Sequence, residues 1–375
     1  MKKIEMVDLR SQYERLRADI DSAVAGVISS TAFIKGPEVR LFEEELQRYL
    51  GVRNVISCGN CTDALQIAMM ALGLRPGDEV ITTDFTFIAT VEVIELLGLK
   101  TVLVEPDPGT FNISVEAIRR AITPNTRAIV PVHLFGQCAD MEPILELARE
   151  NDLFIIEDVA QATGSVYRFS DGMEKKAGTM GTIGCTSFFP SKNLGCYGDG
   201  GALFTDNDEL AALIRSITNH GMKVRYYHDN IGVNSRLDTI QAAILRVKLR
   251  HLDGFNEARL MAAGYYDREL SGLPGITTPL RSPFSTHIFH QYTLRIDRGG
   301  RNSLRECLEN EGIPSMIYYP VPLHTQKAYL HLGYRADDFP VTNRLSGEVL
   351  SLPMHTELDE EQLSYITGCI RSKFN

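Results

Sequence analysis

The chain has 375 residues, of which 44% are hydrophobic and 23% are charged, and its formal net charge at pH 7 is −10. This length fits one large α/β domain and a smaller one, and the ordinary globular composition argues against a disordered chain. The acidic balance excludes a general nucleic-acid binder, because contact with many phosphates needs a basic face.

Between about residues 50 and 205, short β-rich runs alternate with helical stretches, which is the pattern of parallel βαβ units. Gly73 and Gly98 are expected to stop the first two helices, and Asp140 lies where the N-cap of the third is expected. We expect a large domain over residues 1–249. Its predicted strands are 78–84, 100–105, 127–134 and 153–158, and the helices between them are 62–74, 86–98 and 140–151.

The sequence pattern changes after a long helical segment predicted at 237–270. Turn residues at 271–285 precede an alternating strand at 290–296, a helix at 301–313 and a loop rich in Pro and Tyr at 313–324. We therefore expect a second, smaller α+β domain over residues 250–375. The first forty residues are expected to form a helix and a loop that pack on either domain or on a partner subunit.

Neither the N-terminal residues nor the cysteines indicate export. Two lysines near the N-terminus are not followed by an apolar run, and nowhere do 18 uncharged apolar residues follow one another, so we expect a cytoplasmic protein without a membrane contact. The odd count of seven cysteines fits reduced thiols better than a disulfide framework. Cys58 and Cys61 form a CxxC without a second pair, so we expect two buried thiols and no metal site.

The stretch NCTDALQIAMMALGL, which starts at Asn60, opens from a polar turn directly into an apolar helix. The unpaired N–H groups and the dipole at such a helix start bind phosphate, and the hydroxyl of Thr62 would add a donor. The alternative is that Asn60 or Thr62 is only an N-cap.

The stretch LFIIEDVAQATGS ends a predicted strand on Glu157 and Asp158. Ligands of open α/β sheets bind at the carboxyl ends of strands, so an acid here is well placed for chemistry. A carboxylate beside a pyridine nitrogen keeps that nitrogen protonated and lets the ring accept electrons. A metal ligand or a helix cap is the alternative for Asp158.

The stretch TSFFPSKNLGCYGDGGAL contains Lys192 between aromatic residues and a group of glycines. A lysine that forms a Schiff base must lose its proton easily, and desolvation by apolar neighbours favours this loss. Ser187 offers a hydroxyl for a phosphate. The alternative is a solvated lysine in a turn, but this alternative leaves the aromatic, proline and serine neighbours unexplained. Neither a P-loop nor a GxGxxG pattern fits these residues.

With these motifs, the chain resembles the sugar-nucleotide aminotransferases of the DegT/StrS family. The resemblance runs from MVDLRSQY and FIKGPEV to SLPMH, and its most specific stretches are SFFPSKNLGCYGDGGA and GVNSRLDTIQAAIL. It implies the fold type I architecture of aspartate aminotransferase, with a mainly parallel seven-stranded sheet in the large domain. It also implies pyridoxal 5′-phosphate as the cofactor.

The resemblance assigns Lys192 as the lysine that forms the Schiff base and moves the proton. Asp158 would pair with the pyridine nitrogen, Gln161 would hold the ring hydroxyl and Phe87 would stack on the ring. The family usually has glycine at the position of Cys61, whose side chain is expected to crowd the phosphate or to shift the loop slightly. The implied phosphate contacts are Asn60, Cys61, Thr62, Ser187 and, from the second subunit of a homodimer with shared active sites, Asn234.

Within the family, the chain most resembles enzymes that aminate C3 of a UDP-linked 2-acetamido-2-deoxy-3-oxo-glucuronate, with L-glutamate as donor and 2-oxoglutarate as product. Arg236 would then meet a carboxylate of the uronate or of glutamate, and Tyr318, Tyr319 and His324 lie where the family contacts the sugar nucleotide. The alternatives are that Arg236 forms an intersubunit ion pair and that the aromatic residues only pack a loop.

Three other functions remain open on this scaffold. One is an aminotransferase for a dTDP- or UDP-linked 3- or 4-keto-6-deoxysugar. Another is a sugar dehydratase, which Lys192 disfavours because such relatives carry histidine in its place. The third is a non-catalytic regulatory protein, which the intact Lys192, Asp158 and Gln161 disfavour.

Overall fold

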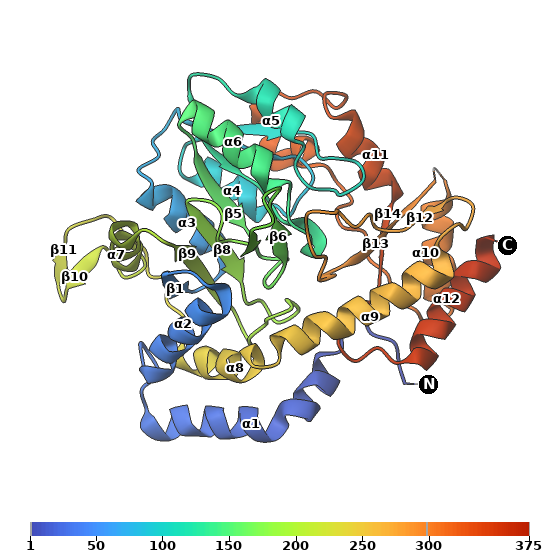
Figure 1. Ribbon diagram of the computed structural model, residues 1–375, viewed down its shortest axis with the longest axis horizontal. Helices are drawn as coiled ribbons and strands as arrows, with labels where there is room; N and C mark the ends of the chain where they lie inside the picture. Colours follow the sequence, from blue (N-terminus) through green and yellow to red (C-terminus); the bar gives the residue numbers. More distant parts are fainter. Residues whose placement is uncertain (1, 298, 375) are drawn as a thin grey trace.

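The computed structural model describes residues 2–297 and 299–374, and a seven-stranded sheet forms its centre (Figure 1). Strands β3, β2, β4, β5 and β8 are parallel neighbours, whereas β9 runs opposite to both of its neighbours, β8 and β1. The predicted mainly parallel sheet is thus confirmed. In order across the sheet, its strands are β1 Asn54–Cys58, β9 Gly201–Thr205, β8 Ile183–Ser187, β5 Phe154–Asp158, β4 Thr126–Val130, β2 Glu79–Thr83 and β3 Lys100–Val104.

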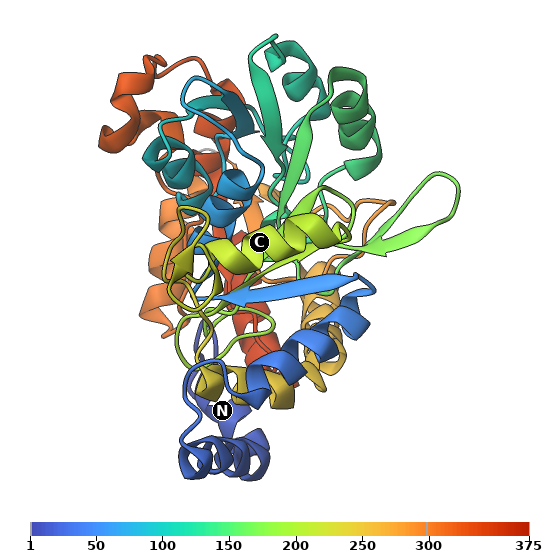
Figure 2. The ribbon, with the colours of Figure 1, turned by 90° about the vertical axis from the view of Figure 1, so that its left-hand side faces the viewer.

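Helices cover both faces of this sheet. Apolar residues of α3, α4 and α7 form one core with Val80 and Ile156, and those of α5 and α6 form another with Ile81 and Ile155. Because neighbouring residues of a strand point to opposite faces, such runs must be apolar at every position. Figure 2 shows α7 and α2 on opposite sides of β1. The helices of this part are α2 Pro37–Leu50, α3 Cys61–Ala71, α4 Ala89–Leu96, α5 Val115–Ala121, α6 Met141–Asn151 and α7 Asp208–Ile217.

The strands and helices predicted between residues 62 and 158 are found, and each is shorter than predicted. Gly73 and Gly98 follow the ends of α3 and α4 with φ of 69° and 67°, a backbone that glycine adopts without strain. Asp140 lies at the N-cap of α6, but its side chain does not cap the helix. Its carboxylate instead accepts a hydrogen bond from the hydroxyl of Tyr167 at 2.7 Å.

The predicted long helix at 237–270 is two helices, α8 Thr239–Leu249 and α9 Leu252–Leu270. The break allows the chain to change direction between two cores. Helix α8 packs on α2 and on α1 Leu9–Ser30, whereas α9 packs on α12 Glu360–Phe374. Apolar residues of α1, such as Leu16 and Ile20, pack against α8, so the N-terminal helix has a place within the described chain.

A second, antiparallel sheet forms the C-terminal part together with α9 and α12. The strand predicted at 290–296 and the helix predicted at 301–313 are found as β13 and α10, whereas β14, α11 and α12 were not predicted. The domain boundary between residues 249 and 250 stays a prediction. The further elements of this part are β12 Ile276–Thr277, β13 Tyr292–Ile296, α10 Gly300–Asn310, the 3-10 helices Leu323–Thr325 and Lys327–Leu332, α11 Pro340–Glu348 and β14 Val349–Leu352.

Two small hairpins complete the structure. They are formed by β6 Val166–Arg168 with β7 Glu174–Lys176, and by β10 Met222–Val224 with β11 Tyr227–His228. A 3-10 turn, Leu134–Gly136, follows β4. Over residues 2–297 and 299–374, no helix has the length and apolar character that crossing a membrane requires.

Candidate active site

A cavity of about 620 Å³ lies where several strands of the large sheet end and the segment 316–320 approaches them. Its position at the carboxyl ends of parallel strands and its size are typical of small-molecule sites. Ten residues singled out from the sequence line this one cavity. They are Asn60, Cys61, Thr62, Phe87, Asp158, Gln161, Ser187, Lys192, Tyr318 and Tyr319.

Lys192 lies in the loop after β8, where its backbone N–H donates to the carbonyl of Phe189 at 2.8 Å. Burial lowers the pKa of its amine, against a smaller opposing effect of Asp158 and Cys61. The loop therefore favours the neutral, nucleophilic amine. Of the two aromatic residues shortly before Lys192 in the chain, Phe189 lines the cavity, whereas Phe188 packs in the core in a T-shaped contact with Phe42.

Asp158 ends β5 and presents its carboxylate to the cavity. Its two oxygens accept hydrogen bonds from the backbone N–H of Ala160 at 3.1 Å and from the hydroxyl of Thr90 at 2.9 Å. Burial raises the pKa of this carboxyl, although the two hydrogen bonds and the charge of Lys192 partly oppose the rise. A buried acid of this kind readily shares a proton with a basic ring nitrogen.

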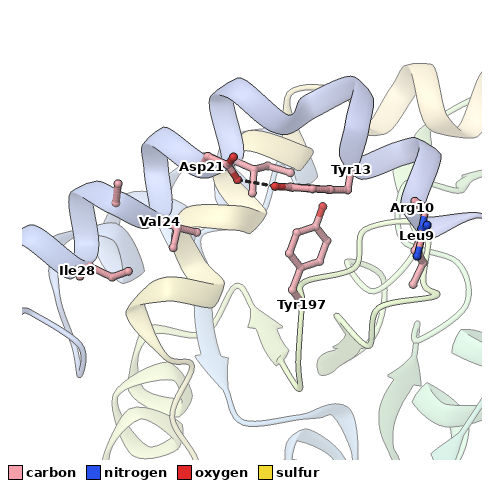
Figure 3. A pocket seen from close by; sticks show the side chains of 9 residues that line it. Leu9, Arg10, Tyr13, Asp21, Val24, Ile28 and Tyr197 are labelled. Carbon is pink, nitrogen blue, oxygen red and sulfur yellow. Dashed lines mark hydrogen bonds between the residues drawn. The ribbon is translucent and has the colours of Figure 1, made fainter.

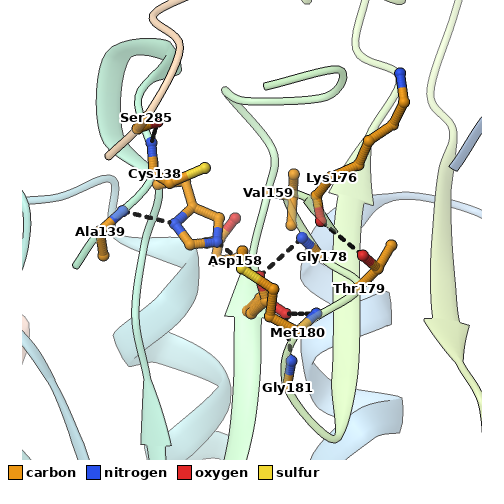
Figure 4. Close-up of polar contacts among 12 residues, drawn as sticks. Cys138, Ala139, Asp158, Val159, Lys176, Gly178, Thr179, Met180, Gly181 and Ser285 are labelled. Atoms are coloured by element: carbon orange, nitrogen blue, oxygen red, sulfur yellow. Dashed lines mark hydrogen bonds and ion pairs between the residues drawn. The ribbon is translucent and has the colours of Figure 1, made fainter. Parts of the chain in front are cut away.

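The neighbouring Glu157 connects the end of β5 to the turn at residues 178–181, whose donors Gly178, Met180 and Gly181 are labelled in Figure 4. Its fully buried carboxylate accepts backbone N–H groups of Gly178, Met180 and Gly181 at 2.8, 2.7 and 2.5 Å. A fourth contact joins it to Nε2 of His133 at 2.9 Å. Because the N–H of Ala139 donates to Nδ1 of His133, Nε2 carries the proton and donates it to Glu157. Four donors around one carboxylate hold this strand end rigidly.

The start of α3 forms the second wall of the cavity. Asn60 is the N-cap, and its side chain accepts from the N–H of Asp63 at 2.8 Å. The N–H groups of Cys61 and Thr62 belong to the first turn, in which helices leave donors free for an anion. Gly201 makes the approach of β9 to this turn possible, since a Cβ there would lie 2.5 Å from the carbonyl carbon of Asn60. Asn60 is therefore both a cap and a cavity residue.

Gln161 connects two walls of the cavity. Its Oε1 accepts from the N–H of Phe135 at 2.8 Å, and its Nε2 donates to the hydroxyl oxygen of Tyr319 at 3.0 Å. The ring of Tyr319 lies 6.3 Å from that of Phe87, whose side chain is 55% exposed and lines the cavity. A flat ligand can therefore contact an aromatic face and polar groups at once.

Three predicted site residues lie outside the lining of this cavity. His324 is buried, with Nδ1 2.6 Å from a carboxylate oxygen of Asp84 and Nε2 3.2 Å from the carbonyl of Ala336. Both ring nitrogens of His324 therefore have partners within the protein, and its substrate contact stays a prediction. Asn234 is exposed and Arg236 is half-buried beside the helix start, so their roles stay predictions.

The cavity also contains residues that the sequence did not reveal. The hydroxyl of Thr86 is buried without a hydrogen-bond partner among the described residues, although its place next to Phe87 was a usable signal. His290 and Gln291 reach the cavity from the segment before β13. A single histidine before a strand has no local pattern that separates it from a core residue.

Comparisons with known proteins place this geometry in a family context. The family model described as the DegT/DnrJ/EryC1/StrS aminotransferase family matches residues 14–371. The pleiotropic regulatory protein of Geobacillus stearothermophilus is 46% identical over 365 residues, with 97% of this chain and 96% of that protein covered. The UDP-2-acetamido-2-deoxy-3-oxo-D-glucuronate aminotransferase of Pseudomonas aeruginosa is 44% identical over 367 residues, with 98% and 99% covered.

A solved structure extends the similarity to three dimensions. The crystal structure of NtdA from Bacillus subtilis, which holds the cofactor PMP, has a TM-score of 0.91 and 31% identity to this chain. The alignment covers 100% of this chain and 86% of that one. PMP is the amine form of pyridoxal phosphate, and the residues here fit that group. They provide free helix N–H groups for the phosphate, an acid for the ring nitrogen, an exposed aromatic face and a lysine amine.

Proposed function

The chain belongs to the DegT/DnrJ/EryC1/StrS aminotransferase family and is a pyridoxal-phosphate-dependent aminotransferase of nucleotide sugars, and on this premise we propose its substrate and residue roles. We propose that it transfers the amino group of L-glutamate to C3 of UDP-linked 2-acetamido-2-deoxy-3-oxo-glucuronate. The product would serve the synthesis of a surface polysaccharide or glycan. The observation that carries the residue roles is that Lys192 and Asp158 share one cavity with the start of α3.

The proposed mechanism assigns the proton transfers to Lys192. When bound, pyridoxal phosphate supplies an aldehyde that carries the amino group and a ring that accepts electrons. With the cofactor bound, the Nζ of Lys192 would take the proton from Cα of glutamate in the first half-reaction and pass it to the carbon that keeps the amino group, and water would release 2-oxoglutarate. In the second half-reaction, Nζ delivers a proton to C3 of the sugar. The lowered pKa of Lys192 suits both steps, because burial makes the neutral amine, which can accept a proton, easier to form.

The other cavity residues hold the reacting groups in place. Asp158 keeps a proton shared with the ring nitrogen, and the bonds from Thr90 and Ala160 fix the direction of its oxygens. Gln161 and Phe87 orient the ring by a hydrogen bond and by stacking. A regulator without catalysis would have no need for Lys192, Asp158 and Gln161 in one cavity.

A positive cluster beside the helix start supports an anionic substrate. Partial burial lowers the pKa of Lys35, and the nearby guanidinium groups of Arg236 and Arg215 lower it further, whereas Glu43, which pairs with Arg215 at 3.0 Å, has a smaller opposing effect. Arg236 forms no ion pair with the residues in the described ranges, so its planar fork is free to bind a carboxylate. We propose that this carboxylate is the uronate group, in line with the substrate named for the relative from Pseudomonas aeruginosa.

We also propose a homodimer in which Asn234 contacts the phosphate in the partner's active site. Asn234 follows the hairpin β10–β11, which stands at the edge of the molecule in Figure 1 and exposes the apolar residues Val224 and Tyr227. An apolar groove of about 690 Å³ lies along α1, where Tyr13 and Tyr197 meet edge to face (Figure 3). A second copy of the chain would cover these surfaces.

A mixing experiment tests the shared site. Lys192→Ala and Asn234→Ala chains are each expected to be nearly inactive alone. In a mixed dimer, one site combines Lys192 of one chain with Asn234 of the other, so unfolding and refolding the two variants together restores activity. Sedimentation measures the dimer, and absence of any restored turnover contradicts the shared site.

The substrate is tested with a panel of keto-sugars and labelled glutamate. We expect turnover of the UDP-linked 3-oxo-glucuronate and slower turnover of its analogue with a neutral C6 group. Arg236→Leu should raise KM for the uronate about 10- to 100-fold, because it removes a charge-assisted pair, and should leave KM for the neutral analogue unchanged. Preferred turnover of a dTDP-linked 4-keto-6-deoxysugar would overturn the proposed substrate.

A further inference from the structure

His290 lies in the wall of the active-site cavity and has no role in the chemistry described above. It precedes β13, its side chain is 5% exposed, and it lines the cavity together with Lys192. One ring nitrogen, Nδ1, is 3.3 Å from Oδ1 of Asn193, the residue after Lys192. The other nitrogen, Nε2, makes no hydrogen bond to the described residues. It is not completely buried, so a ligand in the cavity can reach it.

The protein fixes which nitrogen of His290 carries the proton. The amide nitrogen of Asn193 donates to Oδ1 of Asn256 at 2.7 Å and to the carbonyl of Ile288 at 3.2 Å. Both partners are oxygens, so the orientation of the Asn193 amide is settled and its Oδ1 must accept from the imidazole. Nδ1 of His290 therefore carries the proton, and Nε2 presents a lone pair to the cavity.

The surroundings also keep this imidazole uncharged. Burial lowers the pKa of His290 well below its usual range, and the positive charge of Arg259 lowers it further. Arg259 is itself buried, and its Nη1 donates to the carbonyl oxygens of Phe289, His290 and Met354 at 3.2, 3.3 and 2.9 Å. Arg259 thereby holds the backbone of His290 and keeps a positive charge close to it.

An uncharged acceptor at this position selects among the groups of the substrates. A lone pair attracts an O–H or N–H group and repels a carboxylate or phosphate oxygen. The two carboxylates of glutamate are poor partners for it, and the amino group of glutamate is the group that is transferred. The hydroxyl groups of a sugar are donors of the right kind.

We propose that His290 is a specificity residue whose Nε2 accepts a hydrogen bond from a hydroxyl group of the sugar bound beside Lys192. This inference rests on the nucleotide-sugar substrate class, and it adds a residue that recognises the sugar. It does not depend on which nucleotide or which keto position the enzyme prefers.

The experiment compares the two half-reactions in His290→Leu and His290→Gln, using the keto-sugar that the wild type turns over best. Leu removes the acceptor, whereas Gln can place an amide oxygen near the position of Nε2. We expect His290→Leu to raise KM for the sugar and Kd for the aminated product about 5- to 50-fold, since a buried hydroxyl loses its partner. The glutamate half-reaction, followed by the change in cofactor absorbance, should stay within about 2-fold, and Gln should restore most of the sugar affinity.

A control variant and a set of substrate analogues make the test specific. His287 is also buried, stacks on Phe289 at 3.8 Å and lies outside the cavity lining, so His287→Leu measures the loss of a buried imidazole without the acceptor. One of the singly deoxygenated sugars should bind weakly to the wild type, with no further loss in His290→Leu. Equal effects on both half-reactions, or an unchanged sugar KM in His290→Leu, would overturn the inference. Failure of the wild type with every nucleotide sugar would instead refute the substrate class.

Discussion

The side-chain amide of Gln161 donates from Nε2 to the hydroxyl oxygen of Tyr319 at 3.0 Å, which joins the end of β5 to the segment 316–320. Tyr319→Phe removes this acceptor and leaves the amide unpaired in the cavity wall. We expect the Kd of the apoprotein for pyridoxal phosphate, measured by absorbance titration, to rise about 5-fold, the cost of one net hydrogen bond. Tyr318→Phe is the matched control, because Tyr318 lines the same cavity without a hydrogen bond to the described residues. Equal effects of the two variants would contradict the role of this contact.

Lys192→Ala should abolish the covalent attachment of pyridoxal phosphate and lower kcat by about 10²- to 10⁴-fold or more, because the proton-transfer group is gone. Borohydride reduction followed by peptide mass analysis identifies the modified lysine. Lys248→Met serves as the control, since Lys248 is a buried lysine that does not line the cavity. A pyridoxyl adduct on any residue other than Lys192 in the wild type would refute the assignment.

The sequence predicted the parts of the site that are local in the chain. The strand that ends on Asp158 and the helix that begins after Asn60 both have an apolar run and a polar terminus within a few residues. The role of Lys192 could be predicted for the same reason, because its aromatic, serine and glycine neighbours lie within a few residues of it in the chain. The position of the site follows because ligands bind where such strands end. The fold type and the cofactor were implied by the resemblance to the family.

Contacts between distant segments left no local pattern. His324 pairs with Asp84, and His290 pairs with Asn193, which is 97 residues away in the chain. A buried histidine in a core and one in a cavity wall have the same neighbours in sequence, so periodicity cannot separate them. The strands β8 and β9 were missed because IGCTS and GALFT are short and contain small residues, although all their positions are buried.

Gly201→Ala should disturb the phosphate site without affecting the rest of the sheet. The added Cβ would lie 2.5 Å from the carbonyl carbon and 2.9 Å from the N–H nitrogen that join Asn60 to Cys61, so the helix start must move. We expect the affinity for pyridoxal phosphate to fall about 10-fold or more, since overpacking costs about 1–3 kcal/mol. Gly264→Ala is the control, because a Cβ in this part of α9 meets no atom within 4 Å. Unchanged cofactor affinity in Gly201→Ala would contradict the proposed phosphate position.

Glu157→Gln tests the buried network behind Asp158. Whichever oxygen becomes an amide nitrogen, its hydrogens will face donors from His133, Gly178 or the turn at Met180. We expect the free energy of unfolding, measured in urea, to fall by about 3 kcal/mol, because a buried network loses an acceptor and gains a clash of donors. Glu174→Gln, which breaks the exposed pair with Arg168, should change it by less than about 1 kcal/mol. Similar losses of unfolding free energy in both variants would show that the buried hydrogen bonds of Glu157 stabilise the fold no more than an exposed ion pair does.

Lys248→Met should stabilise the protein at neutral pH and lose this effect in alkali. The side chain of Lys248 is 1% exposed, and burial lowers its pKa from 10.5 to about 8. Between about pH 8 and pH 10.5, Lys248 is protonated in the unfolded chain and neutral in the folded chain. The free energy of unfolding of the wild type therefore rises with pH in this range. Below pH 8 the full cost of the buried charge remains.

The expected gain at pH 7 is up to about 3 kcal/mol, reduced by about 1 kcal/mol for the lost contact with the ring of Tyr197. Urea unfolding at pH 7, 9 and 10.5 measures the difference between wild type and variant, which should shrink toward zero as pH rises through this window. Lys223→Met, at an exposed position of β10, should show no such pH dependence. A difference that stays constant with pH would mean that Lys248 gains stability from packing alone and does not titrate as a buried amine.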